Sequence, residues 1–167
     1  YKRQLMAYGP VEEVVAERAA MGITAVPLRK RRFSAWMNRS HPAASKEPLH
    51  VEDLEGTRFL LAADRLFDDW RVVLEKLCIS HGFTPRIQLR MTPTINGYLA
   101  GNLSDGIIVL SDAWIKDPRF LMREDMVARL LEGKDCHYHL YFVYLGSNDN
   151  PALPTFVEEL KKQAEDI

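Results

Sequence analysis

The feature that most constrains the fold is an alternation of strand-like and helical patterns along the middle of the chain. Three apolar runs are separated by two helical patterns, at residues 58–62, 65–80, 87–91, 92–103 and 107–110. The third run, Ile-Ile-Val-Leu, is apolar throughout, which is typical of a parallel strand covered on both faces. This order of elements predicts an α/β fold with a parallel sheet.

Further elements flank this segment on both sides. Gly9-Pro10 ends the first apolar run, and Gly133-Lys134-Asp135 joins two late strands. Turn residues predict an irregular loop up to Gly56. We expect a strand at 4–8, a weak helix at 11–21, an extended crossing at 23–28, a strand at 33–37, a helical turn at 51–54, strands at 126–131 and 137–145, and a final helix at 154–164.

Charge and cysteine content exclude several classes of protein. The chain has 22 Lys and Arg against 23 Asp and Glu, so it carries no electrostatic footprint for nucleic acid, and we expect it not to bind DNA by itself. The basic cluster at 29–32 is interpreted as a solvated surface patch. Cys78 and Cys136 are expected to be free thiols, which together with the lack of a membrane-spanning run or a signal peptide indicates the cytoplasm.

Residue types that ligate metals come together only at Cys136-His137-Tyr138-His139. On a strand, His137 and His139 share a face while Cys136 points the other way, so the three side chains do not converge on one ion. No nucleophile elbow and no phosphate-cradling glycine loop is present. We therefore predict no catalytic site, no metal and no cofactor; a metal-dependent hydrolase built on His137 and His139 stays open as the enzyme alternative.

Five landmarks in fixed order carry a family resemblance. The first is Val26-Pro27-Leu28, which is followed by a strand and then by His41-Pro42-Ala43. The other four are Val51 to Gly56, Gly82-Phe83-Thr84-Pro85, Asp105 to Leu110, and Asn150 to Phe156. This set resembles the effector-binding (substrate-binding) domain of LysR-type transcriptional regulators over almost the whole chain. Ala43 and Ser111 depart from the pattern, which has Leu and Pro there.

The resemblance implies a two-lobed, periplasmic-binding-protein-like (type 2) α/β fold with mixed sheets and a central cleft. Residues 33–110 would form the second lobe, 29–32 and 111–114 the crossings between lobes, and 1–28 with 115–167 part of the first lobe. The sequence opens on a strand-like run without an initiator Met, so we expect a fragment in which the start of the first lobe is missing.

The function implied is transcription regulation. The domain would bind a small-molecule effector and form a homodimer or homotetramer in the cytoplasm, with one face of the helix at 65–80 facing a partner. DNA would be bound by an N-terminal winged helix-turn-helix, which the family has and this sequence does not contain. An extracellular solute-binding protein of a transporter, which shares the fold, is the alternative.

The effector is expected at the loops that follow two strands of the second lobe. Backbone N–H groups at the starts of the next helices favour an anionic group there. Two simpler interpretations stay open. Thr92 and Thr94 only cap their helix, or Arg65 is solvated or pairs with Asp68 or Asp69. The predicted effector-binding residues are Ala63, Asp64, Arg65, Thr92, Pro93 and Thr94.

Overall fold

The computed structural model describes residues 3–63, 68–91, 97 and 101–165, and it divides the chain into two compact units. The first unit consists of Tyr1–Lys30 and Tyr138–Ile167, and the second of Arg31–His137. Residues 115–137, expected in the first lobe, thus belong to the second unit, because the strand at Met126–Glu132 pairs with strands of that unit. The expected crossing at 111–114 likewise lies inside the second unit.

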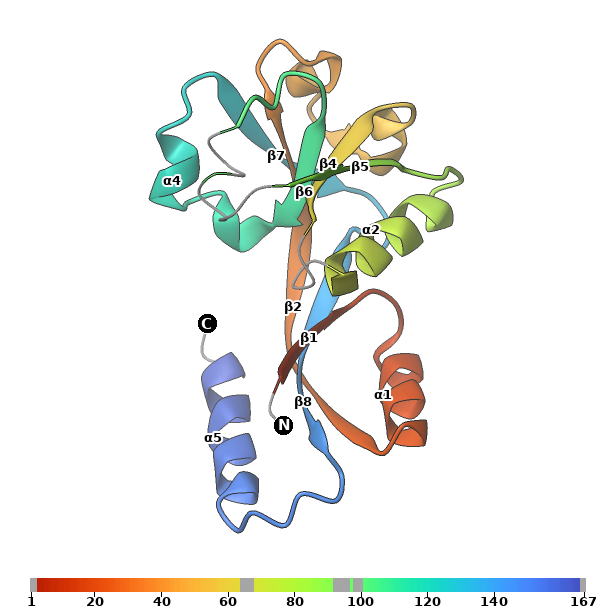
Figure 1. Cartoon of the computed structure of the whole chain (residues 1–167), viewed down its shortest axis with the longest axis vertical. Coiled ribbons are helices and arrows are strands. Elements are labelled where there is room, and N and C mark those ends of the chain that lie inside the picture. The colour runs from red at the N-terminus through yellow and green to blue at the C-terminus, as the bar shows by residue number, and fades with distance from the viewer. Residues whose placement is uncertain (1–2, 64–67, 92–96, 98–100, 166–167) are drawn as a thin grey trace. The chain divides into compact units, whose positions relative to one another are not determined.

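The first unit is a three-stranded sheet in the order β1-β8-β2. Strand β1 pairs antiparallel with β8, with Leu5 opposite Tyr141. Helices α1 and α5 cover opposite faces of this sheet (Figure 1), since Val14 of α1 packs on Tyr141 and Val157 of α5 packs on Phe142, the next residue of β8. The elements are β1 (Arg3–Ala7), α1 (Val11–Ala20), the start of β2 (Ile23–Asn38), β8 (His137–Leu145) and α5 (Leu153–Glu165).

The second unit is a mixed sheet in the order β5-β4-β6-β2-β7. Strand β4 is parallel to β5 and to β6, whereas β2 is antiparallel to β6 and to β7. The short strand β3 pairs parallel with the end of β7. The strands are β3 (Leu49–His50), β4 (Arg58–Ala62), β5 (Arg86–Arg90), β6 (Ile107–Ser111) and β7 (Met126–Glu132).

A different helix packs on each face of this sheet. On one face, Trp70 of α2 packs against Phe33 and donates its indole N–H to the carbonyl oxygen of Val109 at 2.8 Å. On the other face, Trp36 packs edge-on against Phe120 of α4. The helices whose bounds the structure describes in this unit are η1 (Pro42–Ser45), η2 (Val51–Leu54), α2 (Asp68–Ser80), η4 (Asp112–Trp114) and α4 (Pro118–Leu121), of which those labelled η are 3₁₀ turns.

Most predicted elements are present, and two expectations are wrong. The crossing at 23–28 and the strand at 33–37 form one sixteen-residue strand, β2, which neighbours β8 in the sheet and pairs with β6 from Phe33 onward. Within the basic cluster, Arg31 and Arg32 form ion pairs with Asp112 and Glu132. The helix expected to reach Leu103 stops earlier, since residues 101–103 are not helical; its start lies outside the described residues. Gly82, with φ of 90°, ends α2 as predicted.

Within the described ranges, none of the helices has the length and apolar character that crossing a membrane requires.

Candidate functional site

The predicted effector site begins where β4 and β5 end side by side. These strands are parallel and in register, with Ala62 opposite Arg90, and the backbone N–H of Ala63 donates to the carbonyl oxygen of Arg90 at 2.9 Å. The turns after the two strands therefore start next to each other, as the sequence pattern predicted. Ala63 itself is exposed at this edge.

The other predicted effector residues lie outside the described residues. These are Asp64, Arg65, Thr92, Pro93 and Thr94. On either side of them, the structure describes Ala63 and Met91, whose side chain is 86% exposed. The site stays a prediction. Ala63 and Met91, the described residues at which its two loops begin, follow neighbouring strands of the sheet.

A third parallel strand, β6, ends at the same edge, and sequence reasoning missed the turn after it. Phe59 of β4 pairs with Ile107 of β6, so both strands run in one direction. The Ser111 hydroxyl accepts a hydrogen bond from the N–H of Ala113 and so caps η4. The next residue, Asp112, forms a loose ion pair of 3.9 Å with Arg31. The rule that selected the first two turns, ligands at the carboxyl ends of strands, would also have selected Ser111 and Asp112.

This third turn adds both signs of charge to the edge. The side chains of Arg31 and Asp112 are 28% and 26% exposed, so both groups are in reach of solvent. The backbone beneath is fixed by Ser34, whose hydroxyl donates to the carbonyl oxygens of Leu110 and Ser111. A ligand acid at this edge would meet the Arg31 guanidinium, and Asp112 would compete with the ligand for it.

Neither cysteine is arranged to react. Cys78 is fully buried, and burial raises the pKa of its thiol to about 12. Burial, followed by nearby carboxylates, raises the pKa of the Cys136 thiol to about 11, and its Sγ donates to the Glu132 carbonyl oxygen. Because the thiolate is the reactive form, both thiols are inert at neutral pH.

The histidines do not form a metal centre either. His137 and His139 lie on β8, where alternate residues share a face, and Cys136 precedes the strand. Among the described residues, His, Cys, Asp and Glu side chains form no group of three that could hold a metal ion.

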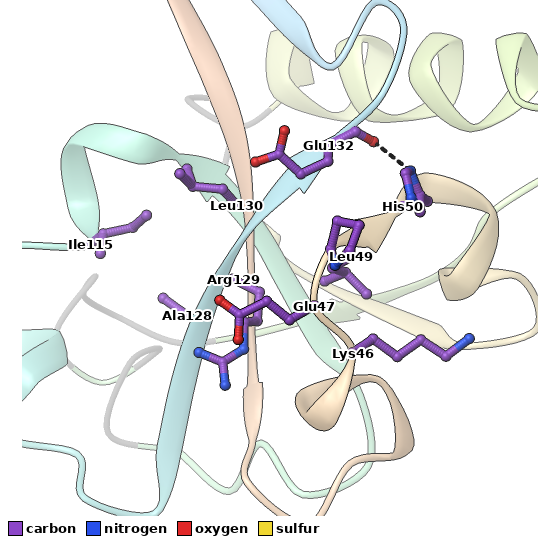
Figure 2. A pocket seen from close by; sticks show the side chains of 10 residues that line it. Lys46, Glu47, Leu49, His50, Ile115, Ala128, Arg129, Leu130 and Glu132 are labelled. Atoms are coloured by element: carbon purple, nitrogen blue, oxygen red, sulfur yellow. Dashed lines mark hydrogen bonds between the residues drawn. The ribbon is translucent and has the colours of Figure 1, made fainter.

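A groove of about 690 Å³ opens beside β7, and no motif indicated it. Its lining comes from three separate segments: residues 46–50 around β3, residues 128–130 and 132 of β7, and Ile115 after η4. We call it the β7 groove; Figure 2 shows it from close by. A sequence pattern could not find it, since each segment contributes only a few ordinary residues.

The sequence matches the family described as "LysR substrate binding domain" over residues 14–165. No curated protein matches the chain.

Solved structures of LysR regulators resemble the fold closely. The effector-binding domain of QuiR in complex with shikimate has a TM-score of 0.69 at 13% identity, over 98% of this chain and 72% of that one. The regulatory domain of CcmR from Synechocystis PCC6803 in complex with 2-PG has a TM-score of 0.65 at 18% identity, over 98% and 74%. Full-length CbnR complexed with its target DNA has a TM-score of 0.66 at 17% identity, over 99% and 54%.

These likenesses confirm the predicted fold class, an α/β fold with mixed sheets of the periplasmic-binding-protein-like type. The chain spans about three quarters of each isolated domain and about half of full-length CbnR.

Proposed function

Because the chain belongs to the LysR substrate-binding domain family, a family of regulatory and not of enzymatic domains, we propose that it senses a small-molecule effector for a transcriptional regulator. The effector binds at the turns after β4 and β5 in the second unit, and a winged helix-turn-helix elsewhere in the protein binds the promoter. Effector binding changes promoter affinity only if the effector binds two states of the regulator unequally. The regulator acts in the cytoplasm.

The observation that carries this proposal is the pairing of Ala62 with Arg90. It places Ala63 and Met91, the described residues at which the two predicted turns begin, next to each other, and backbone N–H groups at the start of a helix favour an anionic ligand. Ligand complexes of related domains, QuiR with shikimate and CcmR with 2-PG, support a small-molecule effector. The nearby Arg31 favours an effector with an anionic group, which Asp64 and Asp112 oppose.

The test of the site replaces Thr92 and Thr94 together by Val, which keeps size and β-branching and removes both hydroxyls. An effector is first found by a thermal-shift screen, because a specific binder raises the melting temperature by mass action. If each hydroxyl makes a hydrogen bond to the effector, affinity falls by about 1 kcal/mol per bond. The matched control is Thr57→Val in the loop before β4. An unchanged affinity in the double variant, with an intact circular dichroism spectrum, moves the site elsewhere.

We also propose that the regulator forms a homodimer with antiparallel subunits. Two such dimers can associate into a homotetramer. The outward side of α2 exposes 46% of Val72 and 61% of Ile79, and Leu89 on the edge strand β5 is 53% exposed. Large apolar residues on neighbouring elements are typical of an interface. Val72→Glu with Ile79→Glu is expected to give monomers by light scattering of the complete sensor domain. Met21→Glu in the first unit is the control, and a dimer that survives the double variant contradicts the assignment.

The alternative, an extracellular solute-binding protein, would share this fold. The part of the gene upstream of this chain distinguishes the two. About 90 upstream residues with a helix-turn-helix favour the regulator, and a lipoprotein signal favours the transporter.

A further inference from the structure

The β7 groove has the composition of a small-molecule site. Apolar side chains of Leu49, Ile115, Ala128 and Leu130 line it, and its volume of about 690 Å³ lies within the range of ligand pockets. Four charged side chains line the same groove, and two of them, Glu47 and Arg129, have opposite signs and no ion pair with a described residue.

A hydrogen bond to a neutral group, not an ion pair, positions the Arg129 side chain. Its Nε donates to the carbonyl oxygen of Ala44 at 3.2 Å, a neutral acceptor. The other lining charges are already engaged: Lys46 pairs with Asp53, and Glu132 pairs with Arg32. Arg129 has no carboxylate partner within ion-pair distance in the described part of the chain. A half-buried guanidinium that is already positioned binds a carboxylate with little loss of side-chain entropy.

Glu47 supplies the opposite charge. It precedes Pro48 in the bend that leads into β3, and it is exposed. No described cation lies within ion-pair distance of its carboxylate, Arg129 included. Figure 2 shows both side chains beside β7, with Ile115 and Leu130 on the apolar part of the groove.

We propose that the β7 groove binds a zwitterionic small molecule with an apolar body, namely an α-amino acid with an aliphatic side chain. Its carboxylate pairs with Arg129, its ammonium group pairs with Glu47, and its side chain contacts Ile115 and Leu130. A simple acid would leave Glu47 facing an anion, and an amine would leave Arg129 facing a cation. A ligand with both charges can pair with both groups.

This site is separate from the proposed effector site. In the sheet order β5-β4-β6-β2-β7, three strand spacings separate β4 from β7, which is roughly 15 Å at the usual spacing. The groove contains no residue from the turns after β4 or β5. Amino-acid binding in the groove is therefore independent of the effector assignment.

The experiment is a titration of the ¹³C-methyl-labelled chain with L-leucine, followed by NMR. We expect saturable shifts of the Ile115 and Leu130 methyl signals. L-leucinamide, which lacks the carboxylate, and N-acetyl-L-leucine, which lacks the ammonium group, should each bind about tenfold more weakly or worse, as loss of a charge-assisted hydrogen bond requires. Glycine, without a side chain, should leave both methyl signals unshifted.

Variants locate the binding. Glu47→Gln, an isosteric change at an exposed position, and Arg129→Met should each weaken L-leucine binding by about tenfold. Glu55→Gln and Arg86→Met, exposed charges outside the groove, are the controls and should bind normally. Because Arg129→Met also removes the bond to Ala44, Glu47→Gln carries the decision if the arginine variant does not fold.

Three results overturn the proposal. The first is the absence of saturable shifts at Ile115 and Leu130, and the second is equal binding of leucine and its two analogues. The third is leucine binding that Thr92→Val with Thr94→Val abolishes and Glu47→Gln leaves intact, which places leucine at the effector site and supports the proposed function while refuting the groove.

Discussion

Gly106 is the position at which one added methyl group tests the packing between β4 and β6, two strands whose carboxyl ends lie at the candidate edge. A Cβ at this residue would lie 2.6 Å from the backbone oxygen of Arg58 and 2.9 Å from two side-chain atoms of Leu60, closer than real Cβ atoms approach other atoms. The Leu60 side chain can turn, but the Arg58 oxygen belongs to the backbone of β4. Gly106→Ala must therefore displace β4 relative to β6, the two strands whose ends define the candidate edge.

Overpacking of this kind costs about 1–3 kcal/mol, and an obstacle in the backbone places Gly106→Ala in the upper half of that range. At roughly 2–4 °C for each kcal/mol in a chain of this length, the melting temperature should fall by about 4–12 °C. The three tryptophans, Trp36, Trp70 and Trp114, all lie in the second unit, so tryptophan fluorescence reports its unfolding selectively.

Gly146→Ala is the matched control. Its added Cβ would lie 3.4 Å from the nearest atom, the Gly22 oxygen, which is ordinary van der Waals contact, and it belongs to the first unit. The fluorescence transition should therefore not move. A Gly106→Ala variant that melts within about 2 °C of the parent would show that β4 yields without measurable cost, and the reasoning from close approach would be wrong.

Three further predictions concern stability, titration and DNA. Trp70→Phe removes the buried indole donor to Val109 and should lower the free energy of unfolding by about 1–3 kcal/mol in urea titrations; a loss under about 0.5 kcal/mol contradicts it. Hydrogen bonds from Arg119 lower the pKa of Asp117 to about 2, so the carboxyl should titrate near pH 2 by ¹³C NMR and shift upward in Arg119→Met. Because the folded pKa lies below the ordinary value of 3.8, this contribution to stability is complete above about pH 4 and is lost as the pH falls toward 2. The isolated chain should not bind promoter DNA specifically at physiological salt in an anisotropy assay, which a sequence-dependent signal would refute.

Local patterns were sufficient for most secondary structure. The apolar run at Ile107–Leu110 predicted a parallel strand, and β6 is parallel to β4 with Ile107, Ile108 and Val109 at most 3% exposed. Gly82 predicted the end of α2, because a positive φ is inexpensive only for glycine. These features depend on residues close together in the chain, so the sequence contains the whole cause.

Long-range pairing was not accessible in the same way. The cluster at 29–32 was interpreted as a solvated surface patch, but Glu132, one hundred residues from Arg32, accepts its hydrogen bond at 2.6 Å. Residues 126–132 have a strand pattern that does not specify a partner, and pairing with β2 places them in the second unit. A partner distant in sequence leaves no local periodicity that identifies it.

For the candidate site, the sequence by itself determined the family and the fold class, and it predicted an effector site in the two turns after β4 and β5. The tertiary structure decided that these turns start side by side, through the pairing of Ala62 with Arg90, and that Asp112 and Arg31 join them at the same edge. It alone produced the β7 groove, where Glu47 and Arg129 lie 82 positions apart in sequence and line one cavity. The physical reason is that motifs record local backbone requirements, whereas a cavity is formed by side chains that only the packing of distant segments brings together.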